Sequence, residues 1–177
     1  MSRNYRLTIG SVAVALLAVS LAASAADDKK DFDSVFIKDA AQRIRGEVEL
    51  SRLVDSRSHS DGVKHYADLQ MKHYKDLLDD VQKIADAQNV KLPDDMGDHQ
   101  KDSKKRLEAA KSTEFDLQYL SDQLDEQQTL IDLFTRASKD CQDRKLRDFA
   151  SKNISDLNDR LANAKELYGK IKEKDRG

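Results

Sequence analysis

The chain has 177 residues, a length that favours a single domain, and 36% of them are charged while only six are Gly and one is Pro. This composition is typical of long helices with solvated outer faces. The formal net charge of −2 argues against sequence-independent binding to nucleic acid, which needs a basic surface.

The first 25 residues have the three parts of a secretory signal peptide. Arg3 and Arg6 give a short positive start, an almost unbroken apolar run follows at 9–21, and Ala-Ser-Ala stands before the cleavage position. The run is too short for a transmembrane helix, which needs about 20 apolar residues. We therefore expect cleavage after Ala25, export to the periplasm or the outside of a bacterial cell, and no transmembrane segment after cleavage.

The mature chain is expected to begin with a flexible segment at 26–31 and to continue as one helical domain over 32–174. The first helix of that domain is expected at 32–57, because its apolar residues recur at helical spacings of three and four. They are Ile37, Ala41, Ile44 and Val48. A second helix with a similar stripe is expected at 62–88, before a break at 89–98 that contains the only proline.

A short helix is expected at 99–110 and two further long helices at 112–138 and 144–173. The stripe of the first of these long helices is apolar except for Gln127, which occupies a core position. Four long amphipathic helices joined by short breaks predict an all-α, four-helix bundle, with an extra short helix before the third long one. Burial of the stripes against one another would stabilise it by roughly 25 cal/mol per Å² of apolar surface.

Short motifs follow one another along the mature chain in a definite order and spacing. They are Ala40-Ala41-Gln42, Gly46-Glu47-Val48-Glu49-Leu50, Leu53, Val63-Lys64, Tyr66-Ala67, Ala85, Val90-Lys91-Leu92-Pro93, Leu107, Phe115-Asp116, Tyr119-Leu120, Phe149-Ala150 and Leu161. Together they resemble the bacterial domain of unknown function 4142 family, whose members are predicted secreted or outer-membrane proteins. The resemblance covers roughly residues 32–168 and implies a ferritin-like bundle.

Members of this family usually place one His on each of three long helices. The matching positions here are Tyr74, Gln127 and Arg160, and none of them is a His. The resemblance therefore implies the fold but no ligand role for these three residues. Glu47 and Glu49 match the paired Glu of the family.

No complete constellation for catalysis or for holding a cofactor or a metal stands in the sequence. A ferritin-like di-iron site needs Glu-x-x-His pairs, and the sequence contains none. His65 and His73 are eight residues apart and do not form the i, i+4 pair that chelates a metal. We therefore predict no catalytic residue, no cofactor and no metal site.

A polar patch inside the bundle is the one candidate site. A buried amide needs hydrogen-bond partners, and Tyr74 offers a hydroxyl to Gln127. Arg160 and Glu47 complete the predicted patch, although Glu47 would also suit a rim position beside a Lys or Arg. Two interpretations stay open, a structural network that fixes how the helices align and the remnant of a ligand pocket.

Cys141 is the only thiol, so it cannot form an internal disulfide. One interpretation is a small apolar residue near a helix end. The other is a thiol that reacts or forms an intermolecular disulfide.

The leading functional hypothesis is a non-enzymatic periplasmic or secreted bundle that binds an unknown protein or envelope component. One alternative is a ferritin-like metal protein or oxidase with a degenerate site, using Glu47, His65 or His73. The other is a periplasmic stress chaperone with an open apolar groove. Metal content would separate the first alternative from the leading hypothesis, and suppression of aggregation would separate the second.

Overall fold

The protein is described by a computed structural model that covers residues 13–174, with side chains for 32–111 and 114–174. This part of the chain is all-helical and contains no strand. Its five helices are α1 (Ala13–Arg57), α2 (Asp61–Ala87), α3 (Asp98–Ala109), α4 (Ser112–Asp140) and α5 (Arg144–Lys174). The predicted all-α helical bundle is therefore confirmed.

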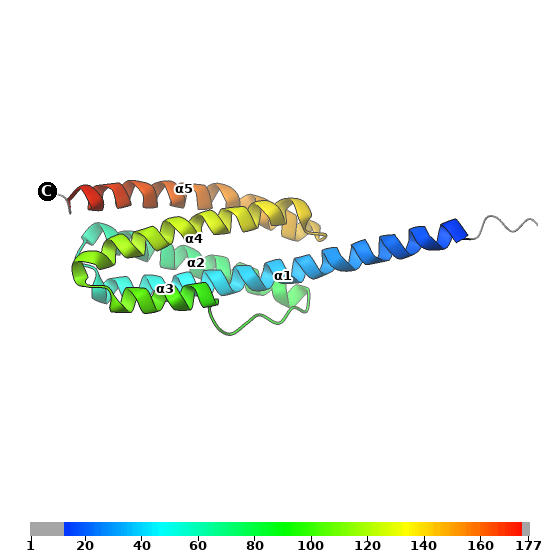
Figure 1. The fold of residues 1–177 in the computed structure, drawn as a ribbon, viewed down its shortest axis with the longest axis horizontal. Coiled ribbons are helices and arrows are strands. Elements are labelled where there is room, and N and C mark those ends of the chain that lie inside the picture. The colour runs from blue at the N-terminus through cyan, green and yellow to red at the C-terminus, as the bar shows by residue number, and fades with distance from the viewer. Residues whose placement is uncertain (1–12, 175–177) are drawn as a thin grey trace, which may run out of the picture.

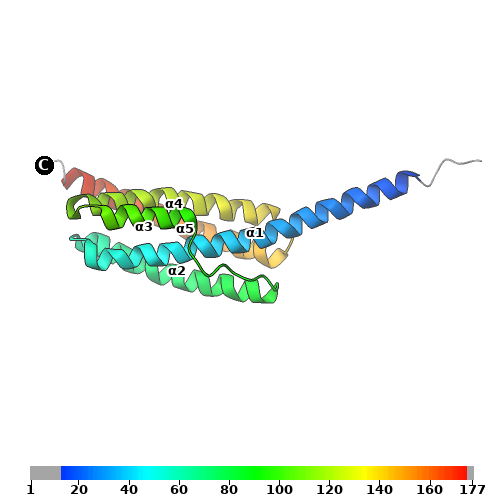
Figure 2. The ribbon, with the colours of Figure 1, turned by 60° about the horizontal axis from the view of Figure 1, so that its bottom comes forward.

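The four long helices lie lengthwise beside one another, and the short α3 lies along one side (Figure 1). Helices α1 and α2 form one hairpin and α4 and α5 form another, and contacts of α1 with α4 and of α2 with α5 join the two hairpins. Helix α3 packs on α1 and α4, and a view from another side shows it beside them again (Figure 2). The short helix thus covers the seam between the two hairpins.

Helices α2 to α5 begin and end within two residues of the predicted positions. Helix α1 differs, because it begins at Ala13 and continues through 26–31, the segment expected to be flexible. Ala and Leu, which dominate the beginning of α1, have high helix propensity, and neither Gly nor Pro interrupts it there. The first part of α1 extends beyond the ends of the other helices (Figure 1).

Local signals explain where α2 begins and ends. The Ser60 hydroxyl caps the first turn by accepting the N–H of Val63 at 3.4 Å. After α2, Asn89 adopts a φ of 55°, a left-handed conformation that Asn tolerates better than most residues. Pro93 then prevents a further helical turn in the connection to α3.

The predicted apolar stripes face one another and form two hydrophobic clusters. The first lies around Phe36, Phe134 and Leu146, and the second around Leu107 and Phe115. Among the described side chains, only Val35 and Leu69 are large, apolar and exposed. None of the described helices is both long and apolar enough to cross a membrane.

Asp33 connects the beginning of the bundle to the turn between α4 and α5. Its buried carboxylate accepts the backbone N–H of Gln142 at 2.8 Å and that of Asp143 at 2.9 Å. Asp143 in turn caps α5 by accepting the N–H groups of Lys145 at 2.6 Å and Leu146 at 3.1 Å. Two carboxylates therefore fix the geometry of this turn.

Candidate functional site, a polar layer inside the bundle

Polar side chains separate the two hydrophobic clusters at the middle of the bundle. Each long helix contributes at least one of them, and all except the arginine are at most 2% exposed. We call this set the polar layer: Glu47, Gln70, Tyr74, Gln123, Glu126, Gln127 and Arg160. Burying so many polar groups is unfavourable unless they pair with one another.

Two hydrogen bonds join α4 to its neighbours across the polar layer. Gln127 on α4 donates its amide N–H to the Tyr74 hydroxyl on α2 at 2.7 Å. Gln123, one turn earlier on α4, donates its amide N–H to the carboxylate of Glu47 on α1. A third and longer contact, at 3.5 Å, runs from the Tyr66 hydroxyl to the amide oxygen of Gln123. Helix α4 is therefore bonded to α1 and α2 inside the core.

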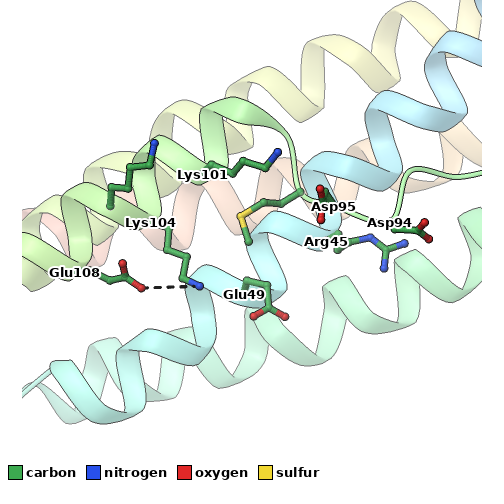
Figure 3. A pocket seen from close by; sticks show the side chains of 9 residues that line it. Arg45, Glu49, Asp94, Asp95, Lys101, Lys104 and Glu108 are labelled. Atoms are coloured by element: carbon green, nitrogen blue, oxygen red, sulfur yellow. Dashed lines mark ion pairs between the residues drawn. The ribbon is translucent and has the colours of Figure 1, made fainter.

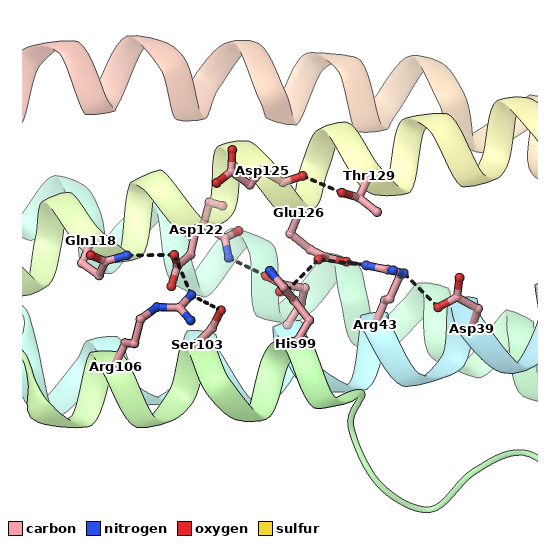
Figure 4. A network of polar contacts seen from close by, with 12 residues as sticks. Asp39, Arg43, His99, Ser103, Arg106, Gln118, Asp122, Asp125, Glu126 and Thr129 are labelled. Atoms are coloured by element: carbon pink, nitrogen blue, oxygen red, sulfur yellow. Dashed lines mark hydrogen bonds and ion pairs between the residues drawn. The ribbon is translucent and has the colours of Figure 1, made fainter.

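Glu126 lies where α1, α3 and α4 meet. The Arg43 Nη1 donates to both of its carboxylate oxygens, at 3.0 and 3.1 Å, and the Arg43 Nε donates to Asp39 at 2.9 Å (Figure 4). On the other side, His99 Nδ1 of α3 lies 3.6 Å from Glu126 Oε2. This carboxylate thus has one cation from α1 and a titratable ring from α3.

A second polar contact joins α3 to α4 one turn further along. Arg106 Nη2 donates to Asp122 at 3.3 Å and to the Ser103 hydroxyl at 2.8 Å, and Gln118 donates to the same Asp122 oxygen at 2.9 Å (Figure 4). The other Asp122 oxygen is buried and has no partner. The side of α3 that faces α4 is therefore mostly polar.

The pKa values of the two buried glutamates are shifted in the same direction. Burial raises the pKa of Glu47 well above its ordinary value, and the nearby charge of Glu126 raises it further, against the opposing hydrogen bond from Gln123. Burial also raises the pKa of Glu126, which the charge of Arg43 partly offsets. Two carboxylates in a region of low dielectric do not both ionise easily, so a proton is favoured on Glu47.

Arg160 lies at the edge of the polar layer. Its Nη1 donates to the amide oxygen of Gln70 at 3.2 Å, and its Nε donates to Asp156 at 2.8 Å. Asp156 also lies 3.0 Å from His73 Nδ1. Burial, and then the charge of Arg160, lower the pKa of His73 to about 4 in spite of this carboxylate. His73 is therefore neutral at pH 7.

The structure brings the four predicted patch residues into one layer, but not as one bonded group. Tyr74 and Gln127 form the expected pair, while Glu47 bonds to Gln123 instead. Arg160 bonds to Gln70 and has no hydrogen bond to the other three within the described residues. The predicted patch thus remains a hypothesis about function, with its geometry now defined.

Gln123 and Glu126 are not among the residues predicted from the sequence. Both belong to a second stripe on α4, adjacent to the predicted one, that also recurs at spacings of three and four. This stripe is buried throughout and consists of Asp116, Tyr119, Gln123, Glu126 and Leu130. The helical spacing of this stripe is visible in the sequence. Because the stripe mixes polar and apolar residues, however, it resembles the solvent-facing side of a helix. Contacts of α4 with α1 and α3 cover it.

The other sequence candidates lie elsewhere. His59 and His65 are exposed, and Glu49 pairs with Arg52 at the surface. Cys141 is buried, and burial raises the pKa of its thiol to about 12. Among the described residues, no three His, Cys, Asp or Glu side chains are grouped so that they could hold a metal ion.

A surface cleft of about 550 Å³ lies beside α3, outside the polar layer. Cationic and acidic side chains line it in equal number, from α1, α3 and the segment before α3 (Figure 3). They are Arg45, Lys101, Lys104, Lys105, Glu49, Asp94, Asp95 and Glu108, together with Met96. The cleft therefore offers charges of both signs to a partner.

A double-mutant cycle on Tyr74 and Gln127 tests whether their bond is structural. Either Tyr74→Phe or Gln127→Leu alone leaves one buried polar group without its partner, and we expect each to cost about 1–2 kcal/mol. The double variant removes both groups and is expected to be no less stable than either single variant. Urea unfolding of the four proteins gives the comparison. Additive losses would mean that the two side chains do not act as a pair.

The fold and the polar layer define the class, an all-α helical bundle with a buried layer of amide, carboxylate and phenol groups. Within that class, the chain belongs to the family described as a domain of unknown function (DUF4142), whose family model matches residues 18–167. No curated protein and no solved structure matches the chain.

Proposed function

We propose that the protein is exported from the bacterial cytoplasm, loses residues 1–25, and binds a protein or envelope component without catalysing a reaction. The proposed fold type is a ferritin-like four-helix bundle, and the closed ring of contacts among α1, α2, α5 and α4 is compatible with it. The periplasm or the cell exterior is the place of action. The signal-peptide pattern carries the export part of the proposal.

One observation carries the binding part. The buried groups of the polar layer mostly satisfy one another, with Glu47 bonded to Gln123 and Tyr74 bonded to Gln127. A group already paired inside a packed core is not free to bind or activate a substrate. The cleft beside α3, by contrast, opens at the surface and offers unlike charges within a short span. Charged surfaces of both signs favour a specific protein partner of complementary pattern.

The small residues at 23–25 support cleavage after Ala25, because signal peptidase requires them there. We expect the protein isolated from the envelope to begin at Ala26, and intact-mass measurement reports this directly.

Site-specific photo-crosslinking tests the binding surface. A photoreactive amino acid in place of Lys104, inside the cleft, is expected to give a discrete adduct in living cells. The matched control replaces Lys152, an exposed lysine on α5, which is not among the residues that line the cleft. Adducts from Lys152 alone, or none from either position, would contradict the proposal. A stoichiometric metal content in protein isolated without chelator would also contradict it.

A further inference from the structure

The segment from 93 to 106 includes most of α3, which packs on α1 and α4 beside Glu126, but it has little apolar attachment of its own. We call it the flap. Between the buried Leu92 and the buried Leu107, its only buried side chains are Gln100 and Ser103, and both are polar. Apolar burial is the main source of attachment for most helices. The flap is therefore held mainly by polar contacts between two apolar anchors.

The beginning of α3 lies very close to α1 at Gly46. A Cβ added at Gly46 would stand 2.5 Å from the Gln100 Cβ, so only glycine permits this approach. Both amide atoms of Gln100 are buried there and have no hydrogen-bond partner. A buried amide without hydrogen-bond partners is unfavourable, and this lowers the stability of the closed flap.

The far end of α3 is attached more firmly. The guanidinium of Arg57 donates to the carbonyl of Ala110 at 2.6 Å, and Leu107 lies in the second hydrophobic cluster. The beginning of α3 has instead His99, 3.6 Å from Glu126. The flap would thus detach first near His99 and pivot about Leu107.

The closed flap helps to keep Glu47 and Glu126 away from water. The charged and titratable groups around Glu47 and Glu126 come from every neighbouring element, and Arg43 is the cation that pairs with Glu126. They are Asp39 and Arg43 of α1, Tyr66 and Tyr74 of α2, His99 and Arg106 of α3, Asp122 of α4, and Arg160 of α5. When both glutamates are ionised, the negative charges in this region outnumber the positive ones.

We propose that the flap is a proton-controlled lid, which closes when Glu47 holds a proton and loosens when Glu47 and Glu126 are both ionised. In the closed position His99 lies beside Glu126, and Gln100 packs on Gly46, the residue next to Glu47, so that the two carboxyl groups are buried. Neutral Glu47 tolerates this burial. Ionisation of both groups makes the closed position costly, and water enters as the flap lifts.

The direction of the effect follows from the raised pKa values of Glu47 and Glu126. A carboxyl whose pKa is raised by burial binds its proton more tightly in the closed state than in the open one. Acidification therefore closes the flap, and a rise in pH above the ordinary glutamate range opens it. Lys101 and Lys104 belong to the flap and also line the surface cleft. The shape of the cleft would therefore change with pH. The lid itself does not depend on the proposed partner.

Hydrogen exchange measures the lid directly. Protection factors of the α3 amides, corrected for intrinsic exchange, are compared at pH 5.5 and pH 8 on the chain as isolated. We expect protection in the first turns of α3 to fall by about tenfold or more at the higher pH, as one linked proton per opening requires. Amides of α5 around Leu157 should not change.

Glu47→Gln supplies the decisive variant, because an amide has nearly the shape of a protonated carboxyl and does not titrate. It is expected to keep α3 protected at both pH values. Glu49→Gln is the matched control, the same change two residues away at the surface, and should behave like the unmodified protein. Carboxyl ¹³C titration of Glu47 in the unmodified protein gives a second reading and should share its midpoint with α3 protection. An unchanged pH response in Glu47→Gln, equal loss in α5, or separate midpoints would overturn the proposal.

Discussion

Alanine in place of Gly46 is expected to destabilise the protein by about 2 kcal/mol, although alanine is the better helix former. The new Cβ would lie 2.3 Å from the Gln100 Cγ and 2.5 Å from its Cβ. The Gln100 Cβ is fixed to the backbone and no side-chain rotation moves it away, so the beginning of α3 must shift. Urea unfolding measures the loss, and limited proteolysis in the 93–97 segment should become faster.

Gly169→Ala is the control for this prediction. Gly169 also lies inside a long helix, but a Cβ there would meet nothing within 4 Å. The substitution should therefore stabilise the protein by about 0.5–1 kcal/mol through helix propensity alone. If Gly46→Ala lowers the free energy of unfolding and Gly169→Ala raises it, the close approach of α3, rather than backbone freedom, decides the effect at Gly46. A stabilising Gly46→Ala would mean that α3 does not lie this close to α1.

Arg43→Gln is expected to cost about 3 kcal/mol at pH 8, because it leaves Glu126 buried without its cation. The Arg43 side chain is 23% exposed and that of Glu126 only 3%, so solvent replaces little of the lost interaction. Without Arg43 the pKa of Glu126 rises further. The loss should therefore be smaller at pH 5, where Glu126 can bind a proton. Thermal unfolding at the two pH values gives both results.

Arg52→Gln makes the same chemical change on the same helix. Arg52 pairs with Glu49, and the side chains are 54% and 34% exposed. Surface pairs contribute between zero and about 1 kcal/mol, so the expected loss is small and nearly independent of pH. Equal losses in Arg43→Gln and Arg52→Gln would mean that water reaches Glu126 in the closed structure.

Much of the fold could be predicted because apolar spacing is a local property of the sequence. The stripe through Ile37 and Ile44 and the break at Pro93 were enough to place helices and their ends. The same reasoning identified Gln127 as a core residue, since it interrupts an otherwise apolar stripe. Its hydrogen bond to Tyr74 could be predicted because an apolar core offers a buried amide few other hydrogen-bond partners.

The rest of the polar layer could not be predicted in this way. Gln123 and Glu126 are buried because α3 and α1 cover that side of α4, and no local pattern reveals which helix faces another. The tight approach at Gly46 was equally hidden, since a glycine inside a helix gives no sign of what packs on it. Burial of polar residues depends on tertiary contacts, and spacing alone reports only periodicity.

The carboxylate of Asp33 has a consequence for the order of folding. Its two N–H partners stand 109 and 110 residues later in the chain. Whether the polypeptide emerges from a ribosome or from a translocation channel, its beginning reaches free solution long before those partners exist. Closing so long a loop is slow and entropically unfavourable. The part of α1 around Asp33 can therefore take its final position only after α4 and α5 have been synthesised. Until then the nascent chain has not completed its fold and can still pass through a channel.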